Sequence, residues 1–246
     1  RLHGFLEDRR EWADRGNLTV LPKDRKLTVD FYNLDSRITG IQYEIRSMED
    51  ESLIERTVVK DWHQDEGAAE AVTILPIQNL IDKAEEYILT LAIATENQPE
   101  IYYYTRIVWT DDAYLEPMIQ MAETFSDNLT TYLETDPVAD NSSLGRVTLK
   151  NSFDQMTWGN LSLEKTGDVE MELKELQGNM ATLCLSYVAA TAGEQGEDSG
   201  ETQEEQDREY YDITESFTMK WSSQRIYMMD YERTMNQIFD GGSEQY

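Results

Sequence analysis

Apolar and polar side chains alternate along much of the first half of the chain, which is the pattern of β-strands with one buried face. In residues 40–46, the apolar side chains of Ile41, Tyr43 and Ile45 are separated by polar ones. This period and the β-branched and aromatic content predict strands at residues 27–32, 40–46, 53–59, 71–75, 87–95 and 101–109. We expect the last two to pair as a hairpin and the set to form a β-sandwich, because short strands separated by frequent turns are typical of that architecture.

The segment from Ile81 to Tyr87 resembles a corner of fibronectin type III and related immunoglobulin-like modules. In that corner a large aliphatic residue ends one strand, and a Tyr six residues later opens the next. The resemblance implies that the Tyr87 hydroxyl bonds to the corner backbone and fixes the crossover between two sheets. It also implies that five of the predicted strands correspond to strands B, C, E, F and G of such a module. The absence of a Pro in the corner and of a Trp in the B strand departs from the family pattern, so an ordinary strand tyrosine stays an alternative.

Residues 111–136 carry the long amphipathic helix that the sequence predicts. Large apolar side chains return there every three or four residues, which places them on one helix face. Because Pro117 is tolerated only in a first turn, we expect the helix to begin near Glu116 and to end before Asp136. Its apolar face is rich in Met and aromatic residues, which favours packing against a sheet.

The remainder of the chain is again rich in strand patterns, predicted at residues 145–150, 156–163, 169–173, 180–189, 211–221 and 225–231. Residues 231–239 place Met235 and Ile238 on one face and predict a short closing helix. Residues 191–209 contain eight acids, one Arg and no large apolar side chain, so we expect this acidic loop to be disordered.

These patterns predict a mainly β fold in three parts. The first is an immunoglobulin/fibronectin-like β-sandwich at residues 1–110, and the second is a connecting helix at residues 111–136. The third is another β-rich domain at residues 137–246.

The charge of the chain excludes one large class of partners. The 246 residues contain 49 acids and 21 Lys or Arg, which gives a formal net charge of −28. Nucleic acid is therefore not an expected partner, because its binding depends on basic side chains that neutralise phosphates. A single Cys excludes an internal disulfide, and no apolar stretch approaches the ~20 residues of a membrane-spanning helix.

The sequence offers no catalytic signature, so we expect no catalytic residue, no metal and no cofactor. His3 and His63 are the two histidines, and neither forms a metal-ligand pair. Cys184 lies within a predicted strand, where a thiol is typically inert. Two alternatives stay open: calcium bound by the acidic residues 61–65 or 136–141, and a glycoside hydrolase built on two of the many carboxylates.

Tyr103 and Trp109 are the candidate binding residues, because the predicted strand at 101–109 places aromatic rings on both of its faces. An exposed row of rings could stack on sugars or on a partner protein, which would make the chain a carbohydrate-binding module. A buried row would be ordinary core, and we favour that interpretation.

Residues 20–27, 41–48 and 225–235 resemble uncharacterised membrane-anchored extracytoplasmic proteins of anaerobic Gram-positive bacteria. The resemblance implies a compartment and not an activity. The chain begins with Arg1 and not with Met, so we expect a processed piece of a longer protein that an N-terminal anchor holds in the membrane. A cytoplasmic protein is the alternative.

Together these features predict a non-catalytic extracytoplasmic interaction or structural module of a larger membrane-anchored bacterial protein. Its expected partner is a protein or a component of the cell envelope. Besides the carbohydrate-binding and hydrolase alternatives, an extracytoplasmic sensor that regulates a membrane kinase is a third.

Overall fold

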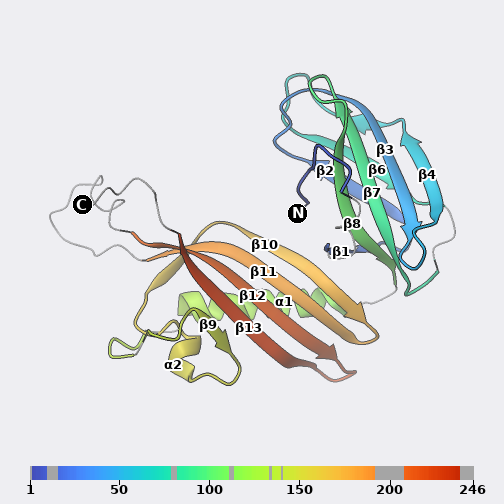
Figure 1. Cartoon of the computed structure of the whole chain (residues 1–246). Helices are drawn as coiled ribbons and strands as arrows, with labels where there is room; N and C mark the ends of the chain where they lie inside the picture. Colours follow the sequence, from blue (N-terminus) through green and yellow to red (C-terminus); the bar gives the residue numbers. More distant parts are fainter. Residues whose placement is uncertain are drawn as a thin grey trace. The chain divides into compact units, whose positions relative to one another are not determined.

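A computed structural model describes residues 2–9, 16–78, 82–110, 114–132, 135–139, 141–191 and 208–238. The chain is mainly β, as predicted, and it divides into two compact units (Figure 1). Unit 1 comprises Arg1–Asp112 and unit 2 comprises Ala113–Tyr246. Within the described residues, no helix has the length and apolar character needed to cross a membrane.

Unit 1 contains two β-sheets. The larger has the strand order β1-β8-β7-β3-β4, formed by β1 (Leu18–Leu21), β8 (Ile101–Trp109), β7 (Glu86–Thr95), β3 (Ile38–Ser47) and β4 (Leu53–Val59). The smaller has the order β2-β6-β5, formed by β2 (Lys26–Phe31), β6 (Ala71–Pro76) and β5 (Trp62–His63). β1 runs parallel to β8, and the other neighbours are antiparallel. The predicted hairpin between residues 87–95 and 101–109 is confirmed.

One hydrophobic core joins the two sheets of unit 1. Ile41, Tyr43 and Ile45 face inward from β3, as their alternation predicts, and they belong to the same buried cluster as Phe31 and Leu75 from the smaller sheet. The inward faces of both sheets therefore bury their apolar side chains against one another.

Tyr87 forms the backbone hydrogen bond that the corner resemblance implies. The backbone N–H of Asp82 donates to the Tyr87 hydroxyl at 2.9 Å. Burial raises the pKa of Tyr87 above its ordinary value. Ile81, the aliphatic residue at the other end of the predicted corner, lies outside the described residues.

Unit 2 is built on one antiparallel sheet of long strands. The order is β10-β11-β12-β13-β9, with β10 (Leu163–Gln177), β11 (Met180–Thr191), β12 (Tyr210–Trp221), β13 (Ile226–Ile238) and β9 (Arg146–Thr148). The predicted acidic loop at 191–209 connects β11 to β12, and its residues 192–207 lie outside the described residues.

Helix α1 (Leu115–Asp127) packs on one face of the unit 2 sheet (Figure 1). Its Met118 and Ala122 are buried in one cluster with Leu183 of β11 and Phe217 of β12. The helix is shorter than the predicted 111–136, because a π-helix, η2 (Asn128–Tyr132), follows it directly.

Two of the local predictions for unit 2 were wrong. Residues 231–239 do not form a closing helix, because β13 continues to Ile238. Met235 and Ile238, three residues apart, would share a helix face, but on β13 they lie on opposite faces, and Met235 is buried while Ile238 is exposed. The strand predicted at 156–163 is also absent from the described residues, since helix α2 (Phe153–Met156) ends there and β10 begins only at Leu163.

Candidate functional site

The sheet of unit 2 carries polar side chains on the face where apolar ones are expected. Glu215 of β12 and Arg233 of β13 lie directly opposite each other and are both 0% exposed. Ser126, Lys165 and Tyr231 contact one another or Glu215 nearby, and we call these five residues the polar cluster. A buried charge is costly unless hydrogen bonds compensate it, so the partners of each member decide what the cluster can do.

Both carboxylate oxygens of Glu215 accept hydrogen bonds within the protein. The Tyr231 hydroxyl donates to Oε1 at 2.7 Å, and the Ser126 hydroxyl donates to Oε2. Ser126 is fully buried on α1, so this carboxylate ties the helix to the centre of the sheet. Burial, followed by the negative charge of Glu215, raises the pKa of Tyr231, which keeps its hydroxyl protonated as a donor.

Lys165 of β10 links the sheet to the end of α1. Its Nζ donates to Ser126 Oγ at 2.9 Å and to Asp127 Oδ1 at 2.7 Å. A serine beside a lysine can act as a nucleophile when the amine takes the hydroxyl proton. Here the Lys165 side chain is ion-paired with Asp127, and the Ser126 hydroxyl donates to Glu215. The arrangement therefore holds elements together and does not activate the serine.

The Arg233 guanidinium caps the C-terminal end of helix α2. Its two terminal nitrogens donate to the carbonyl oxygens of Gln155 and Met156, each at 2.8 Å. These carbonyls belong to the last turn of α2, where backbone acceptors have no partner inside the helix. The guanidinium also stacks on the Trp158 ring, with Cζ 3.4 Å from the ring centroid. Burial lowers the pKa of Arg233 below its ordinary value.

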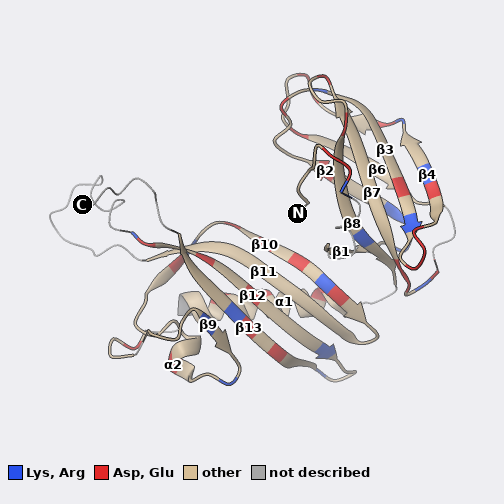
Figure 2. Ribbon diagram, in the orientation of Figure 1, with Lys and Arg blue, Asp and Glu red and all other residues tan. Residues whose placement is uncertain are grey.

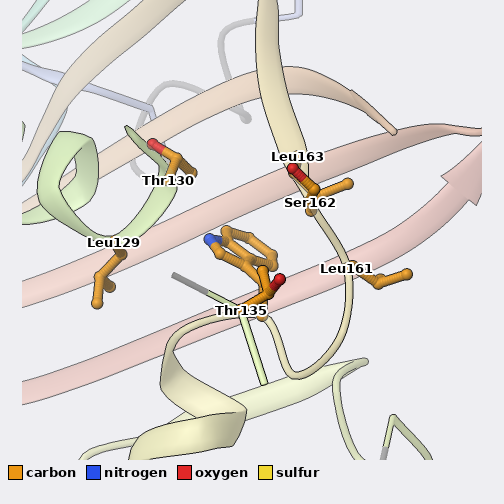
Figure 3. A pocket seen from close by; sticks show the side chains of 7 residues that line it. Leu129, Thr130, Thr135, Leu161, Ser162 and Leu163 are labelled. Atoms are coloured by element: carbon orange, nitrogen blue, oxygen red, sulfur yellow. The ribbon is translucent and has the colours of Figure 1, made fainter. Parts of the chain in front are cut away.

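A pocket of about 350 Å³ lies beside the polar cluster within unit 2. Figure 3 shows Leu129 and Thr130 on a helical turn, facing the segment that carries Leu161, Ser162 and Leu163. Thr135 and Trp158 complete the lining. Trp158 therefore borders the pocket and, through Arg233, also contacts the cluster.

Unit 1 contains the buried carboxylates Glu44 and Glu55, and Glu55 is also held by internal hydrogen bonds. The Tyr43 hydroxyl donates to its Oε1 at 2.5 Å, and the backbone N–H of Gln78 donates to its Oε2 at 3.1 Å. Burial is the main reason why the pKa of Tyr43 is raised, and the hydrogen bond to Glu55 adds to it. Glu55 and Glu215 thus each accept hydrogen bonds from hydroxyl or amide groups of the protein itself.

The aromatic candidates Tyr103 and Trp109 lie on β8 of unit 1. Both are half-buried and pack against its hydrophobic core. The Tyr103 ring meets Phe31 edge-on at 6.4 Å between centroids, and burial raises the pKa of Tyr103. The guanidinium of Arg25 lies 5.2 Å from the Trp109 ring centroid. The structure thus packs both rings against the core of unit 1, whereas the polar cluster belongs to unit 2.

The remaining candidates from the sequence are dispersed. His63 Nε2 lies 3.3 Å from Asp65 Oδ1 on an exposed surface. Cys184 is half-buried on β11, and burial raises the pKa of its thiol. Over the part of the chain that the structure describes, no three His, Cys, Asp or Glu side chains are grouped to hold a metal ion. Asp140, in the acidic segment 136–141, lies outside that part.

Lys and Arg are interspersed with Asp and Glu along the described strands of both units (Figure 2). This distribution, with the net charge of −28, disfavours nucleic acid as a partner. No protein-family model matches the chain, and no curated protein sequence is similar to it. Its function is therefore inferred from the fold and from the site.

The sequence-based prediction missed the polar cluster, although the pattern of strand residues contains a signal for its two ions. The buried face of β12 carries Ile213, Glu215 and Phe217. The buried face of β13 carries Tyr231, Arg233 and Met235. A charged residue in the apolar phase of a strand indicates a buried ion. Ser126 and Lys165 give no such signal, because their places in the cluster depend on tertiary packing.

Proposed function

We propose that the chain is a non-catalytic extracytoplasmic module of a larger membrane-anchored bacterial protein, and that it binds another macromolecule of the cell envelope. The observation that carries the proposal is the strand order of unit 1. The order β2-β6-β5 corresponds to strands B, E and D of an immunoglobulin-like sandwich, and β8-β7-β3-β4 corresponds to G, F, C and C′. Modules with this order are common in cell-surface proteins.

The hydrogen bond between Asp82 and Tyr87 supports the same assignment, because this tyrosine corner recurs in immunoglobulin-like modules. The polar cluster supports a non-catalytic role. Its carboxylate, hydroxyl and ammonium groups bond to one another, which leaves them poorly placed to act on a substrate.

An apolar patch on the smaller sheet of unit 1 is the surface that we assign to the partner. Val72 and Ile74 lie in one phase of β6, and Ile74 is 51% exposed. Tyr32, which directly follows β2, is 60% exposed. Exposed apolar side chains that share a sheet face are typical of protein-binding surfaces.

The test measures saturable binding of the purified chain to cell envelopes isolated from an anaerobic Gram-positive bacterium. We expect Ile74→Asp to weaken binding at least about tenfold, because a charge at an interface centre must be desolvated. Val58→Asp is the matched control, since Val58 is an aliphatic residue on the larger sheet of unit 1 that is 63% exposed. Binding to purified glycans that Tyr103→Ala or Trp109→Ala abolishes would instead establish a carbohydrate-binding module, and equal binding by both Asp variants would refute the assigned patch.

A further inference from the structure

Two buried hydrogen-bond donors that touch each other in unit 2 have no hydrogen-bond partner among the described residues. They are Trp158 Nε1 and Arg233 Nε. Buried polar atoms are satisfied in the great majority of cases, so a group of unpaired donors in one region calls for a physical reason. One such reason is an acceptor that a bound molecule supplies.

Trp158 connects these donors with the pocket. Its side chain is 1% exposed and lines the pocket, while its ring stacks on Arg233. Its backbone has a φ of +73°, a left-handed conformation that is rare for a bulky residue. Strain of this kind persists where the surrounding structure holds a side chain in a required place, often at a ligand site.

The opposite side of the pocket has an unusual backbone too. Leu129 and Thr130 belong to the π-helix η2. Single π-helical turns are rare in proteins overall, but those that occur are often found at functional sites, because the wider turn alters where its side chains project. The π-helix and the strained Trp158 are independent observations on two different walls of one pocket.

The lining determines the chemistry of a ligand. Leu129, Leu161 and Leu163 offer apolar contacts, Thr130 and Ser162 offer hydroxyls, and no charged side chain is among the described lining residues. The net charge of −28 repels anions, and the Arg233 cation beneath the indole disfavours a cation. A volume of about 350 Å³ is at the small end of the range for ligand pockets.

We propose that this pocket binds a small neutral molecule with an apolar body and one carbonyl or hydroxyl oxygen, which accepts a hydrogen bond from Trp158 Nε1. The indole nitrogen has almost no exposed surface, so the proposal includes a shift of the indole toward the pocket when the ligand binds. The site is in unit 2, whereas the proposed envelope-binding patch is in unit 1, so the two proposals can fail separately.

The experiment uses the full chain labelled with 5-fluorotryptophan and observed by ¹⁹F NMR. The chain has five Trp residues, and the Trp158 signal is assigned by its loss in Trp158→Phe. If that variant does not fold, replacing Trp12, Trp62, Trp109 and Trp221 one at a time gives the same assignment. Three probes of similar size are titrated: acetophenone, which has a carbonyl; ethylbenzene, which has no acceptor; and benzoate, which is an anion.

We expect acetophenone to shift the Trp158 signal saturably with a Kd of about 1 mM or tighter. Ethylbenzene and benzoate should each bind at least about fivefold more weakly, because one lacks the acceptor and the other must desolvate its charge. No saturable shift with acetophenone would overturn the proposal. Equal affinity for ethylbenzene would overturn the hydrogen bond, and equal affinity for benzoate would overturn the preference for a neutral ligand.

A pair of variants locates the binding. Ser162→Phe places a ring at the pocket, and because Ser162 is exposed the core is left intact. Ser52→Phe makes the same change at an exposed serine of unit 1. We expect the acetophenone response to be lost in Ser162→Phe and kept in Ser52→Phe, while both variants keep the thermal unfolding of the parent chain. Unchanged binding by Ser162→Phe would overturn the assignment of the pocket.

Discussion

The Arg233 guanidinium lies over the Trp158 ring, with 3.4 Å between Cζ and the centroid of the ring. A cation over an indole ring is stabilising by roughly 2 kcal/mol or more when both groups are removed from water. Here both are fully buried, and the same guanidinium also caps helix α2. One side chain therefore joins the sheet, a short helix and a pocket wall.

Arg233→Met is expected to lower the free energy of unfolding of unit 2 by about 3–5 kcal/mol, because it leaves Glu215 buried without its opposite charge. Urea unfolding, with unit 2 followed through its own transition, measures the loss. Arg225→Met is the matched control: Arg225 also lies over an aromatic ring, 4.7 Å from the centroid of Tyr227, but it is exposed. Its replacement should have only a small fraction of the effect, and similar losses in the two variants would contradict the importance of burial.

Tyr87→Phe removes the hydroxyl that accepts the hydrogen bond of the Asp82 backbone. We expect unit 1 to lose about 1 kcal/mol of unfolding free energy, the usual net value of one such bond. Denaturant unfolding of unit 1 checks the prediction. Tyr102→Phe, on an outward-facing ring of β8 with a hydroxyl bonded to exposed Glu100, serves as the control. A Tyr87→Phe variant as stable as the parent would show that the corner bond is dispensable.

Gly159→Ala should destabilise unit 2 more than Gly167→Ala. Both glycines have a positive φ, +61° and +74°, where a Cβ costs roughly 1–2 kcal/mol. A Cβ on Gly159 would in addition lie 2.3 Å from Asn141 Oδ1, whereas a Cβ on Gly167 meets nothing within 4 Å. Thermal unfolding of the two variants gives the difference, and an equal loss would mean that Asn141 moves aside without cost.

Ionised Glu44 is expected to raise the free energy of unfolding of unit 1 at neutral pH. This contribution is lost in acid. Burial alone would raise the pKa of its carboxyl, but hydrogen bonds from Arg56 and Arg46 outweigh burial and lower it below the ordinary value. Since the folded-state pKa is the lower one, the contribution is complete above the unfolded-state pKa of 4.5 and disappears as the pH falls through the folded-state value.

The measurement compares the parent chain with Glu44→Gln by urea unfolding between about pH 7 and pH 3. The stability difference between them should be constant down to about pH 5 and then shrink. Glu51→Gln, at an exposed glutamate of the following turn, is the control and should follow the parent at every pH. A difference for Glu44→Gln that stays constant to the lowest pH would contradict the effect.

Strand patterns predicted most of the fold because a buried sheet face imposes a period of two. Ile41, Tyr43 and Ile45 reveal β3 in this way, and they all face the core. The prediction failed at Met235 and Ile238, whose spacing of three fits one face of a helix, because they lie on opposite faces of β13. The start of α2 was missed although Ser152 and Gln155 form a capping box there, because the prediction followed apolar periodicity and not capping chemistry.

The pairing of Glu215 with Arg233 also restricts how the long strands can align. A slip of one residue would turn every inward side chain of β13 to the other face, but a slip of two would keep apolar residues facing the helix. A slip of two residues would place Arg233 opposite Ile213 or Phe217. Arg233 and Glu215 would then be buried charges without an opposite charge across the strand pair. Glu215 and Arg233 thus fix the register of the β12–β13 hairpin, because the registers shifted by one or two residues are energetically costly.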